Sequence, residues 1–97
     1  MMNELKPAQA GTLESNDIMI TIAPGAQGSG VVIDLESIVL AQYGPAIKQT
    51  IAAVVAEQNV TDIYIKAVDR GALDCTIQAR TLTALARMGV ISPKELI

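Results

Sequence analysis

Histidine is absent from this 97-residue chain, and cysteine occurs only once, as Cys75. Without an imidazole, the chain cannot itself supply a Ser-His or Cys-His nucleophile pair, nor a histidine-ligated zinc site. A single thiol also excludes an internal disulfide framework and a cluster of thiolate metal ligands. We therefore expect no catalytic residues and no metal site. These absences favour a carried or binding module over an enzyme.

Large aromatic side chains, basic clusters and long apolar runs are also missing. The chain has two tyrosines and no phenylalanine or tryptophan, although 51% of its residues are apolar, so its core must be mainly aliphatic. The formal net charge is −3 and no run of basic residues occurs, which argues against nucleic acid or an anionic membrane as a partner. No apolar run approaches the ~20 residues of a membrane-spanning helix. Residues 1–9 lack the pattern of a signal peptide, so the expected location is the cytoplasm.

Four stretches have the alternation of apolar and polar residues that predicts a β-strand. They comprise residues 18–23, 31–35, 61–68 and 74–80. A short loop between the first two predicts an antiparallel hairpin. In the fourth stretch Cys75 falls on the apolar side, which favours a buried structural cysteine over a reactive thiol. A helix over residues 73–88 is the competing interpretation of this last stretch, because its apolar residues also keep helical spacing.

Residues 25–30 have the glycine spacing G-x-x-G-x-G, which could suggest a phosphate-binding loop. A dinucleotide-binding loop has a different order of glycines and opens a helix, whereas this loop joins two predicted strands. We therefore interpret it as a flexible hairpin loop.

One long amphipathic helix is predicted over residues 45–58. Gly44 and Pro45 form its start signal, since proline is tolerated at the first helical position. Four apolar residues then recur at i, i+4, i+7 and i+8 and form a single stripe. They are Ile47, Ile51, Val54 and Val55. A second, shorter helix is expected from Thr81, closed by Gly89, whereas residues 38–42 are compatible with a strand or a helical turn.

Together these elements predict a two-layer α+β sandwich with the order strand-strand-helix-strand-strand-helix and a mainly antiparallel sheet. Residues 1–97 are expected to form a single domain. Residues 1–9 should be a loose lead-in, and residues 92–97 a C-terminal tail.

Immediately before the first predicted strand lies the polar stretch Glu14-Ser15-Asn16-Asp17, which has the composition of a turn. Ser15 should therefore point into solvent while the adjoining strand holds it in place. That combination suits a covalent attachment site, which another enzyme must be able to reach. On turn chemistry alone, an ordinary turn is the commoner explanation.

Two separated motifs resemble those of the citrate lyase acyl carrier proteins, the gamma subunits of that complex. The motifs are Gly11-Thr12-Leu13-Glu14-Ser15-x-Asp17-x-Met19-Ile20 and Asp69-Arg70-Gly71-Ala72-Leu73-Asp74-Cys75. They occur in the family's order, in a chain of the family's length. In that family the serine of the Glu-Ser-x-Asp motif carries a phosphoribosyl-dephospho-coenzyme A group through a phosphodiester. Ser15 is the only serine here that matches.

The resemblance implies a carrier subunit without catalytic residues of its own. A thiol on the attached arm would hold an acetyl group as a thioester. A transferase (alpha) subunit would exchange that acetyl for citrate with release of acetate, and a lyase (beta) subunit would cleave the citryl group to oxaloacetate. A prosthetic-group transferase is a further implied partner.

The charged residues of both motifs permit two further hypotheses. Glu14 and Asp17 could repel the anionic phosphodiester and keep the arm free of the surface. Asp69, Arg70 and Asp74 could form an edge that partner subunits recognise, although a solvated hairpin turn is the simpler explanation.

Three alternative functions remain open. The chain could be the related carrier subunit of malonate decarboxylase, but the two motifs favour the citrate lyase branch. A carrier of citramalate lyase would handle a similar acid, and the sequence does not separate it. If Ser15 is never modified, the chain could be a small non-covalent scaffold or regulatory domain.

Overall fold

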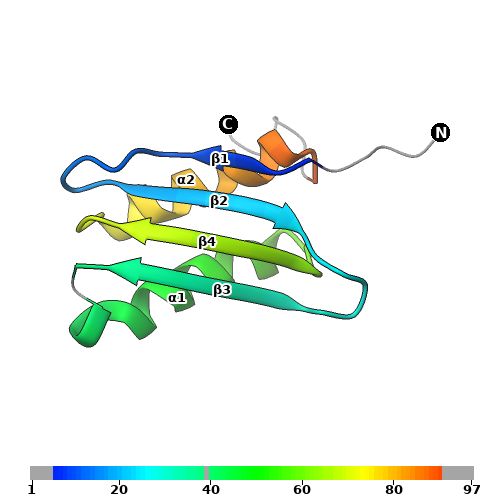
Figure 1. Cartoon of the computed structure of the whole chain (residues 1–97), viewed down its shortest axis with the longest axis horizontal. Coiled ribbons are helices and arrows are strands. Elements are labelled where there is room, and N and C mark those ends of the chain that lie inside the picture. Colours follow the sequence, from blue (N-terminus) through cyan, green and yellow to red (C-terminus); the bar gives the residue numbers. More distant parts are fainter. Residues whose placement is uncertain (1–5, 39, 91–97) are drawn as a thin grey trace.

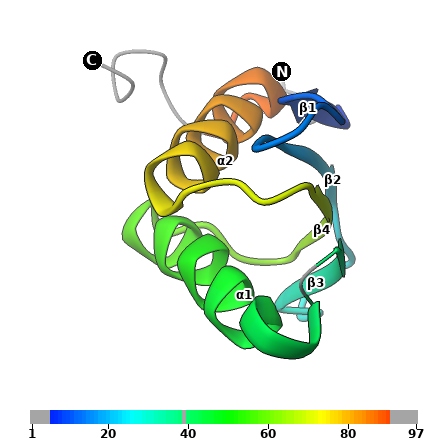
Figure 2. The same cartoon turned by 90° about the vertical axis from the view of Figure 1, so that its left-hand side faces the viewer.

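The computed structural model describes residues 6–38 and 40–90, in which four strands form one sheet and two helices cover one face of it (Figures 1 and 2). The elements in chain order are β1 (Ala8–Ala10), β2 (Ile18–Pro24), β3 (Val31–Ser37), α1 (Leu40–Glu57), β4 (Ile63–Asp69) and α2 (Asp74–Met88). The predicted fold class, a two-layer α+β sandwich, is confirmed. Neither helix in this part of the chain has the length and apolar character needed to cross a membrane.

The sheet has the strand order β1-β2-β4-β3, so β4 lies between β2 and β3. β2 pairs with β4 in antiparallel fashion, from Ile18 opposite Asp69 to Pro24 opposite Ile63. β1 is also antiparallel to β2, whereas β3 runs parallel to β4. The prediction of a mainly antiparallel sheet is confirmed, but the predicted hairpin between β2 and β3 is wrong.

The loop between β2 and β3 spans the beginning of β4 and does not close a hairpin. Gly25 N donates to the Asp62 carbonyl oxygen at 2.7 Å, and Gly30 N donates to Asp62 Oδ1 at 2.9 Å. A Cβ atom on Gly25 would lie only 3.0 Å from the Asp62 carbonyl oxygen. The backbone passes so close to Asp62 that a side chain at position 25 would be crowded, which explains the glycine there.

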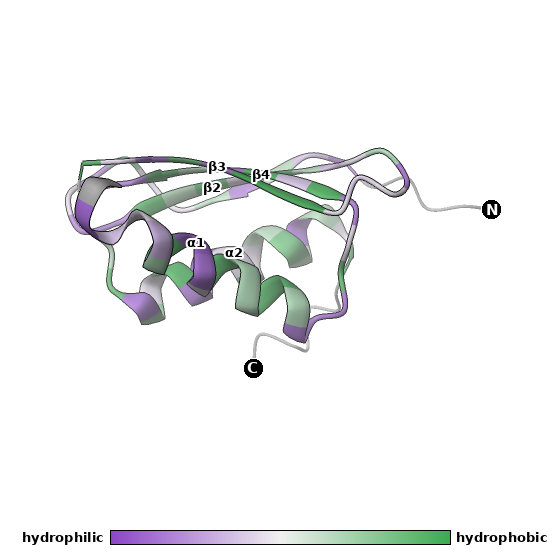
Figure 3. Ribbon diagram, turned by 90° about the horizontal axis from the view of Figure 1, so that it is seen from below, coloured by the Kyte–Doolittle hydropathy of each residue, from purple (hydrophilic) through white to green (hydrophobic). Residues whose placement is uncertain are grey.

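The core lies between the sheet and the two helices (Figure 3). The alternating isoleucines of β2 and β4 point into it, and every member of the predicted apolar stripe of α1 is buried. These α1 residues are Ile47, Ile51, Val54 and Val55. The helix begins at Leu40, about one turn earlier than predicted, so Pro45 lies inside it. Leu40 to Gln42 are therefore helical, which resolves part of the stretch that was ambiguous in sequence.

The predicted fourth strand, residues 74–80, is wrong because these residues form the first half of α2. Its buried residues follow a helical period from Ile77 to Met88 and pack under the sheet. Thr81 lies among them because its hydroxyl donates to the Ile77 carbonyl oxygen at 2.8 Å. The helix ends where predicted, at Gly89, whose φ of 97° is left-handed.

The lead-in predicted for residues 1–9 is not wholly loose, because β1 includes Ala8 and Gln9. Three residues of β1 pair with β2, and Arg87 Nη1 donates to the Gln9 carbonyl oxygen at 2.8 Å. A three-residue strand with two alanines has little β-propensity, so tertiary pairing creates it. Residues 1–5 and the predicted tail at residues 92–97 lie outside the described residues.

Several connections meet at one end of the sheet, on the left in Figure 1. The loop between β1 and β2 lies there, because Ile18 at the start of β2 pairs with Asp69 at the end of β4. Ser37 at the end of β3 pairs with the same residue. Both helices also begin at this end (Figure 1). The two sequence motifs are therefore brought together in space.

Candidate functional site

Ser15 occupies the second position of a β-turn at this end of the sheet. The turn closes when Asp17 N donates to the Glu14 carbonyl oxygen at 3.2 Å. Asn16, in the third position, has a φ of 66°, the positive value that a type II turn requires there. Ser15 is exposed, as predicted. Among the described residues, no hydrogen bond or ion pair involves its hydroxyl group.

The residue that fixes this turn is Asp17, which is 9% exposed. Arg80 of α2 donates to both of its carboxylate oxygens, from Nε at 3.0 Å and from Nη2 at 3.0 Å. Thr12 Oγ1 donates to Oδ2 at 2.7 Å, and Ile18 N donates to Oδ1 at 2.7 Å. The hydrogen bonds from Arg80, followed by those from Thr12 and Ile18, hold the pKa of Asp17 at about 2, against the opposing effect of burial.

The start of the loop between β1 and β2 is also constrained. Thr12 Oγ1 also accepts a hydrogen bond from Glu14 N at 3.2 Å, so one hydroxyl links the loop to Asp17. Gly11 has a φ of 93°, and a Cβ atom there would come within 1.8 Å of the Ile18 carbonyl oxygen. Only glycine fits at this position without moving β2.

The second motif holds the other side of the turn. Asn16 N donates to the Arg70 carbonyl oxygen at 2.8 Å, and Arg70 N donates to the Asp17 carbonyl oxygen at 2.9 Å. The two residues that follow Ser15 are therefore bonded through their backbones to Arg70, the residue after the end of β4. The Ser15 hydroxyl is therefore exposed on a turn whose backbone is held in place.

The second motif is itself held in place by Asp69, a residue that is only 1% exposed. Its carboxylate accepts hydrogen bonds from Ser37 Oγ at 2.9 Å, Gly71 N at 3.1 Å and Ala72 N at 3.0 Å. The solvated turn considered for this motif is therefore wrong for Asp69, whereas Arg70 and Asp74 are exposed.

Sequence reasoning missed Arg80, which is 63 positions from its partner Asp17. The reason is the strand wrongly predicted for residues 74–80. Only a helix that begins at Asp74 directs Arg80 to the Ser15 turn. The pairing also corrects the charge hypothesis for Asp17. Its carboxylate is buried against a guanidinium, so of the two flanking acids only Glu14 presents an exposed charge.

Cys75 lies in the first turn of α2 and is exposed. The prediction of a buried structural cysteine is wrong, because the residue belongs to a helix and faces away from the core. Within the described residues no group of three or more acidic or thiol side chains is placed to hold a metal ion.

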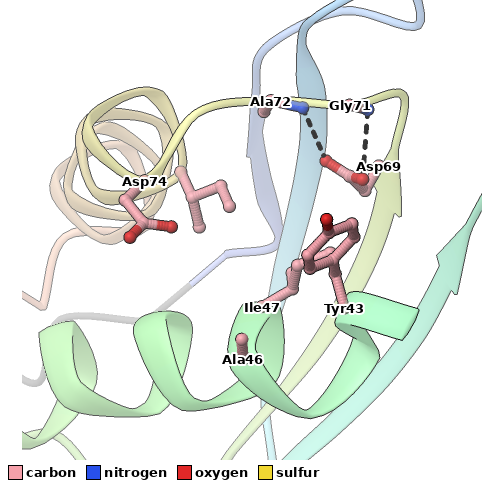
Figure 4. A pocket seen from close by; sticks show the side chains of 8 residues that line it. Tyr43, Ala46, Ile47, Asp69, Gly71, Ala72 and Asp74 are labelled. Carbon is pink, nitrogen blue, oxygen red and sulfur yellow. Dashed lines mark hydrogen bonds between the residues drawn. The ribbon is translucent and has the colours of Figure 1, made fainter. Parts of the chain in front are cut away.

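A hollow of about 260 Å³ opens next to the second motif, between the first turns of α1 and α2 (Figure 4). Ala46, Ile47 and Ile77 line its apolar part. Tyr43 and Asp74 lie at opposite sides of it, and Asp69, Gly71 and Ala72 close it toward the sheet (Figure 4).

Chemically, the turn offers a hydroxyl group and no imidazole to activate it, because the chain contains no histidine. Such a hydroxyl is suited to being modified by another protein. The arrangement fits a carrier domain, and comparison with known proteins gives that class. A family model described as "ACP: Malonate decarboxylase delta subunit (MdcD)" matches residues 5–88.

The similar proteins narrow the class further. The citrate lyase acyl carrier protein of Streptococcus uberis is 49% identical over 86 residues, which cover 89% of this chain and 83% of that protein. The protein of the same name from Lactiplantibacillus plantarum is 49% identical over 82% of this chain and 81% of its own length. That from Streptococcus equi subsp. equi is 51% identical over 82% of this chain and 78% of its own length. The chain belongs to the family of citrate lyase acyl carrier proteins, and is a carrier subunit.

Proposed function

We propose that Ser15 is the residue through which this carrier subunit works, as the covalent attachment point of a phosphoribosyl-dephospho-coenzyme A group. The observation that carries the proposal is the exposed Ser15 hydroxyl on a turn that Asp17, Arg70 and Arg80 hold in place. The residues fit a covalent group, because the hydroxyl has no competing hydrogen bond among the described residues and the turn projects into solvent.

When attached, the group supplies a thiol that carries acetyl or citryl units as thioesters. The chain's own residues supply position. The buried Asp17 carboxylate and the Gly11 backbone fix the root of the arm, so that a tethered thioester is offered to neighbouring active sites at an effective concentration of order millimolar. In this proposal the chain contributes no general acid or base to the reaction.

The proposed partners are the transferase (alpha) and lyase (beta) subunits of citrate lyase, together with the enzyme that attaches the group. The complex would cleave citrate to acetate and oxaloacetate in the cytoplasm. The names of the similar proteins favour citrate lyase over malonate decarboxylase. Citramalate as the substrate, and an unmodified scaffold domain, are the alternatives that the following test and assays of the complex distinguish.

The test is the intact mass of the chain produced together with its maturation enzymes. We expect a mass increase of one phosphoribosyl-dephospho-coenzyme A group in the wild-type chain and none in Ser15→Ala. Ser29→Ala is the matched control, because Ser29 is also exposed but lies in the loop at the opposite end of the sheet (Figure 1). It should gain the full mass. A modified Ser15→Ala chain would refute the assignment.

A further inference from the structure

The hollow beside the Ser15 turn has a composition that the attachment of an arm does not by itself explain. Its volume of about 260 Å³ is just below the ~300–1,000 Å³ typical of sites for drug-sized ligands, so it suits one small rigid group. Ile47 and Ile77 give it apolar walls. The ring of Tyr43, a residue that is 51% exposed, stands at one side and the Asp74 carboxylate at the other (Figure 4).

Gly71 links the hollow to Asn16, the residue that follows Ser15. Gly71 forms part of its lining, and a Cβ atom built on Gly71 would lie 3.6 Å from Asn16 Oδ1. Asn16 N is also bonded to the carbonyl oxygen of Arg70. A group attached to Ser15 would therefore leave the protein surface beside this hollow, and its first portion would be the portion within easiest reach.

The polar atoms around the hollow are suited to a ligand that donates hydrogen bonds. The Gly71 and Ala72 amides already donate to Asp69, so they are not available to an acceptor. The Asp74 carboxylate makes no hydrogen bond or ion pair with another side chain in the described part of the chain and is an acceptor. Among the lining side chains only the Tyr43 hydroxyl is a donor, so a thioester or amide carbonyl would find few partners here. A planar base with an exocyclic amino group would find an acceptor and an aromatic face.

Arg70 adds a cation at the same place. It is exposed, and its backbone is bonded on both sides to the Ser15 turn, through Asn16 N and the Asp17 carbonyl oxygen. A guanidinium at this position can pair with a phosphodiester attached to Ser15. The order of groups from the turn outward, a cation for phosphate followed by an apolar hollow with a carboxylate, matches the order of groups in a nucleotide.

We propose that the hollow between the first turns of α1 and α2 binds the adenine ring of the nucleotide portion of the arm attached to Ser15. The adenine ring stacks on Tyr43 and its amino group donates to Asp74, while Arg70 pairs with the phosphodiester. This inference rests on the proposed function. It implies that the nucleotide portion lies along the carrier and that only the portion beyond it moves between partner subunits.

The first experiment uses the bare chain, so that it does not depend on modification of Ser15. Dephospho-coenzyme A is titrated into chain with ¹³C-labelled methyl groups, with pantetheine as the probe that lacks adenine. We expect dephospho-coenzyme A to shift the methyl signals of Ile47 and Ile77, and pantetheine to leave them in place. Equal shifts with both probes, or none with either, would overturn the proposal.

A pair of tyrosine variants tests the contact itself. Tyr43→Leu should reduce the apparent affinity for dephospho-coenzyme A by about 5- to 150-fold, since base stacking on an aromatic ring is lost. Tyr64→Leu is the matched control, because this second, half-exposed tyrosine lies on β4 and points to the opposite face of the sheet, where its hydroxyl donates to Asp34. It should bind as the wild type does. Equal weakening in both variants would contradict the assigned contact.

The attached arm is then examined in chain whose mass shows full modification. The Ile47 and Ile77 methyl signals should take the positions they reach at saturation with dephospho-coenzyme A. If the mass shows a loaded Ser15 but these signals stay at their bare-chain positions, the adenine proposal fails while the carrier proposal stands. If the chain is never modified but the titration still shifts these signals, the carrier proposal fails and the hollow remains an adenine site.

Discussion

Among single residues, Asp17 explains how Ser15 is presented. Asp17 is buried and bonded two positions after Ser15, and it holds the turn on which the exposed Ser15 lies. Asp17 accepts hydrogen bonds from a helix, from its own loop and from the first amide of β2. These contacts join three parts of the chain at one carboxylate, and a buried carboxylate is stable only with such partners. The ion pair between Asp17 and Arg80 therefore helps to hold the turn that exposes Ser15.

Acid should therefore weaken the fold through Asp17. Its pKa is lowered from 3.8 to about 2 in the folded chain, so its contribution is fully present above its unfolded pKa and is lost as the pH falls through the folded value. The full shift would correspond to at most about 2.5 kcal/mol, and less is expected because the Arg80 side chain is 41% exposed and screened by solvent. Urea unfolding at pH 6 and pH 2.5 measures this loss.

The control separates Asp17 from the other carboxylates. Asp17→Asn should be less stable than wild type at pH 6 and should lose less stability on acidification. Glu36→Gln, which changes an exposed carboxylate on β3, should keep the wild-type pH dependence. An unchanged acid response in Asp17→Asn would show that the carboxylate is not held as described.

Two glycines with similar backbone angles provide a second test at the residue scale. Gly11 and Gly28 have φ values of 93° and 85°, but a Cβ atom would meet the Ile18 carbonyl oxygen at 1.8 Å only at Gly11, whereas nothing lies within 4 Å at Gly28. Gly28→Ala should cost about 1–2 kcal/mol from the left-handed conformation alone. Gly11→Ala should cost more than about 3 kcal/mol in thermal or urea unfolding. Equal losses would contradict the tight loop before Ser15.

At the scale of elements, α2 decides which residues can reach the Ser15 turn. Starting the helix at Asp74 buries Ile77 and Leu85 and turns Arg80 toward Asp17. The alternating pattern of residues 74–80 fits a strand equally well over that short length. The longer helical period through Met88 prevails, because the helix covers the sheet beside α1 (Figure 2).

The single cysteine tests this assignment directly. Cys75 lies exposed in the first turn of α2, so its thiol should react with a disulfide reagent such as dithiobis(nitrobenzoic acid) at a rate close to that in denaturant. A strand with Cys75 in the core would protect the thiol and slow the native reaction by orders of magnitude. The two rates are compared at the same pH on wild-type chain, and strong protection would contradict the helix.

The elements with a strong local signal in the sequence were predicted correctly. The isoleucines of β2, the apolar stripe of α1 and the C-terminal Gly89 of α2 all have sequence signals of the expected kind. The exposed position of Ser15 was predicted for the same reason, from turn-forming residues beside a strand. The motif that contains Ser15 could be read directly from the chain.

The other features depend on distant partners, which one sequence does not reveal. β1 exists because it pairs with β2. β4 lies between β2 and β3, and the loop at residues 25–30 crosses its beginning with hydrogen bonds to Asp62. The Asp17–Arg80 pair joins the beginning of the chain to its last helix. Each of these is a long-range contact that overrides local preference.

In the whole molecule, the two sequence motifs lie at one end of the sheet. The Ser15 turn, the second motif and the beginnings of both helices lie together there (Figure 1). The opposite end carries the glycine-containing loop around Asp62. Enzymes that act on the arm we propose at Ser15 would therefore have to approach this end.

If Ser15 carries the group that we propose, an active complex needs that group on this chain. The most direct measurement is the mass, with fragmentation, of the chain isolated from a reconstituted complex that is cleaving citrate. We predict that the added mass lies on Ser15 and that a complex built with Ser15→Ala cleaves no citrate, while Ser29→Ala retains full activity. An active complex whose chain carries no added mass at Ser15 would contradict the account.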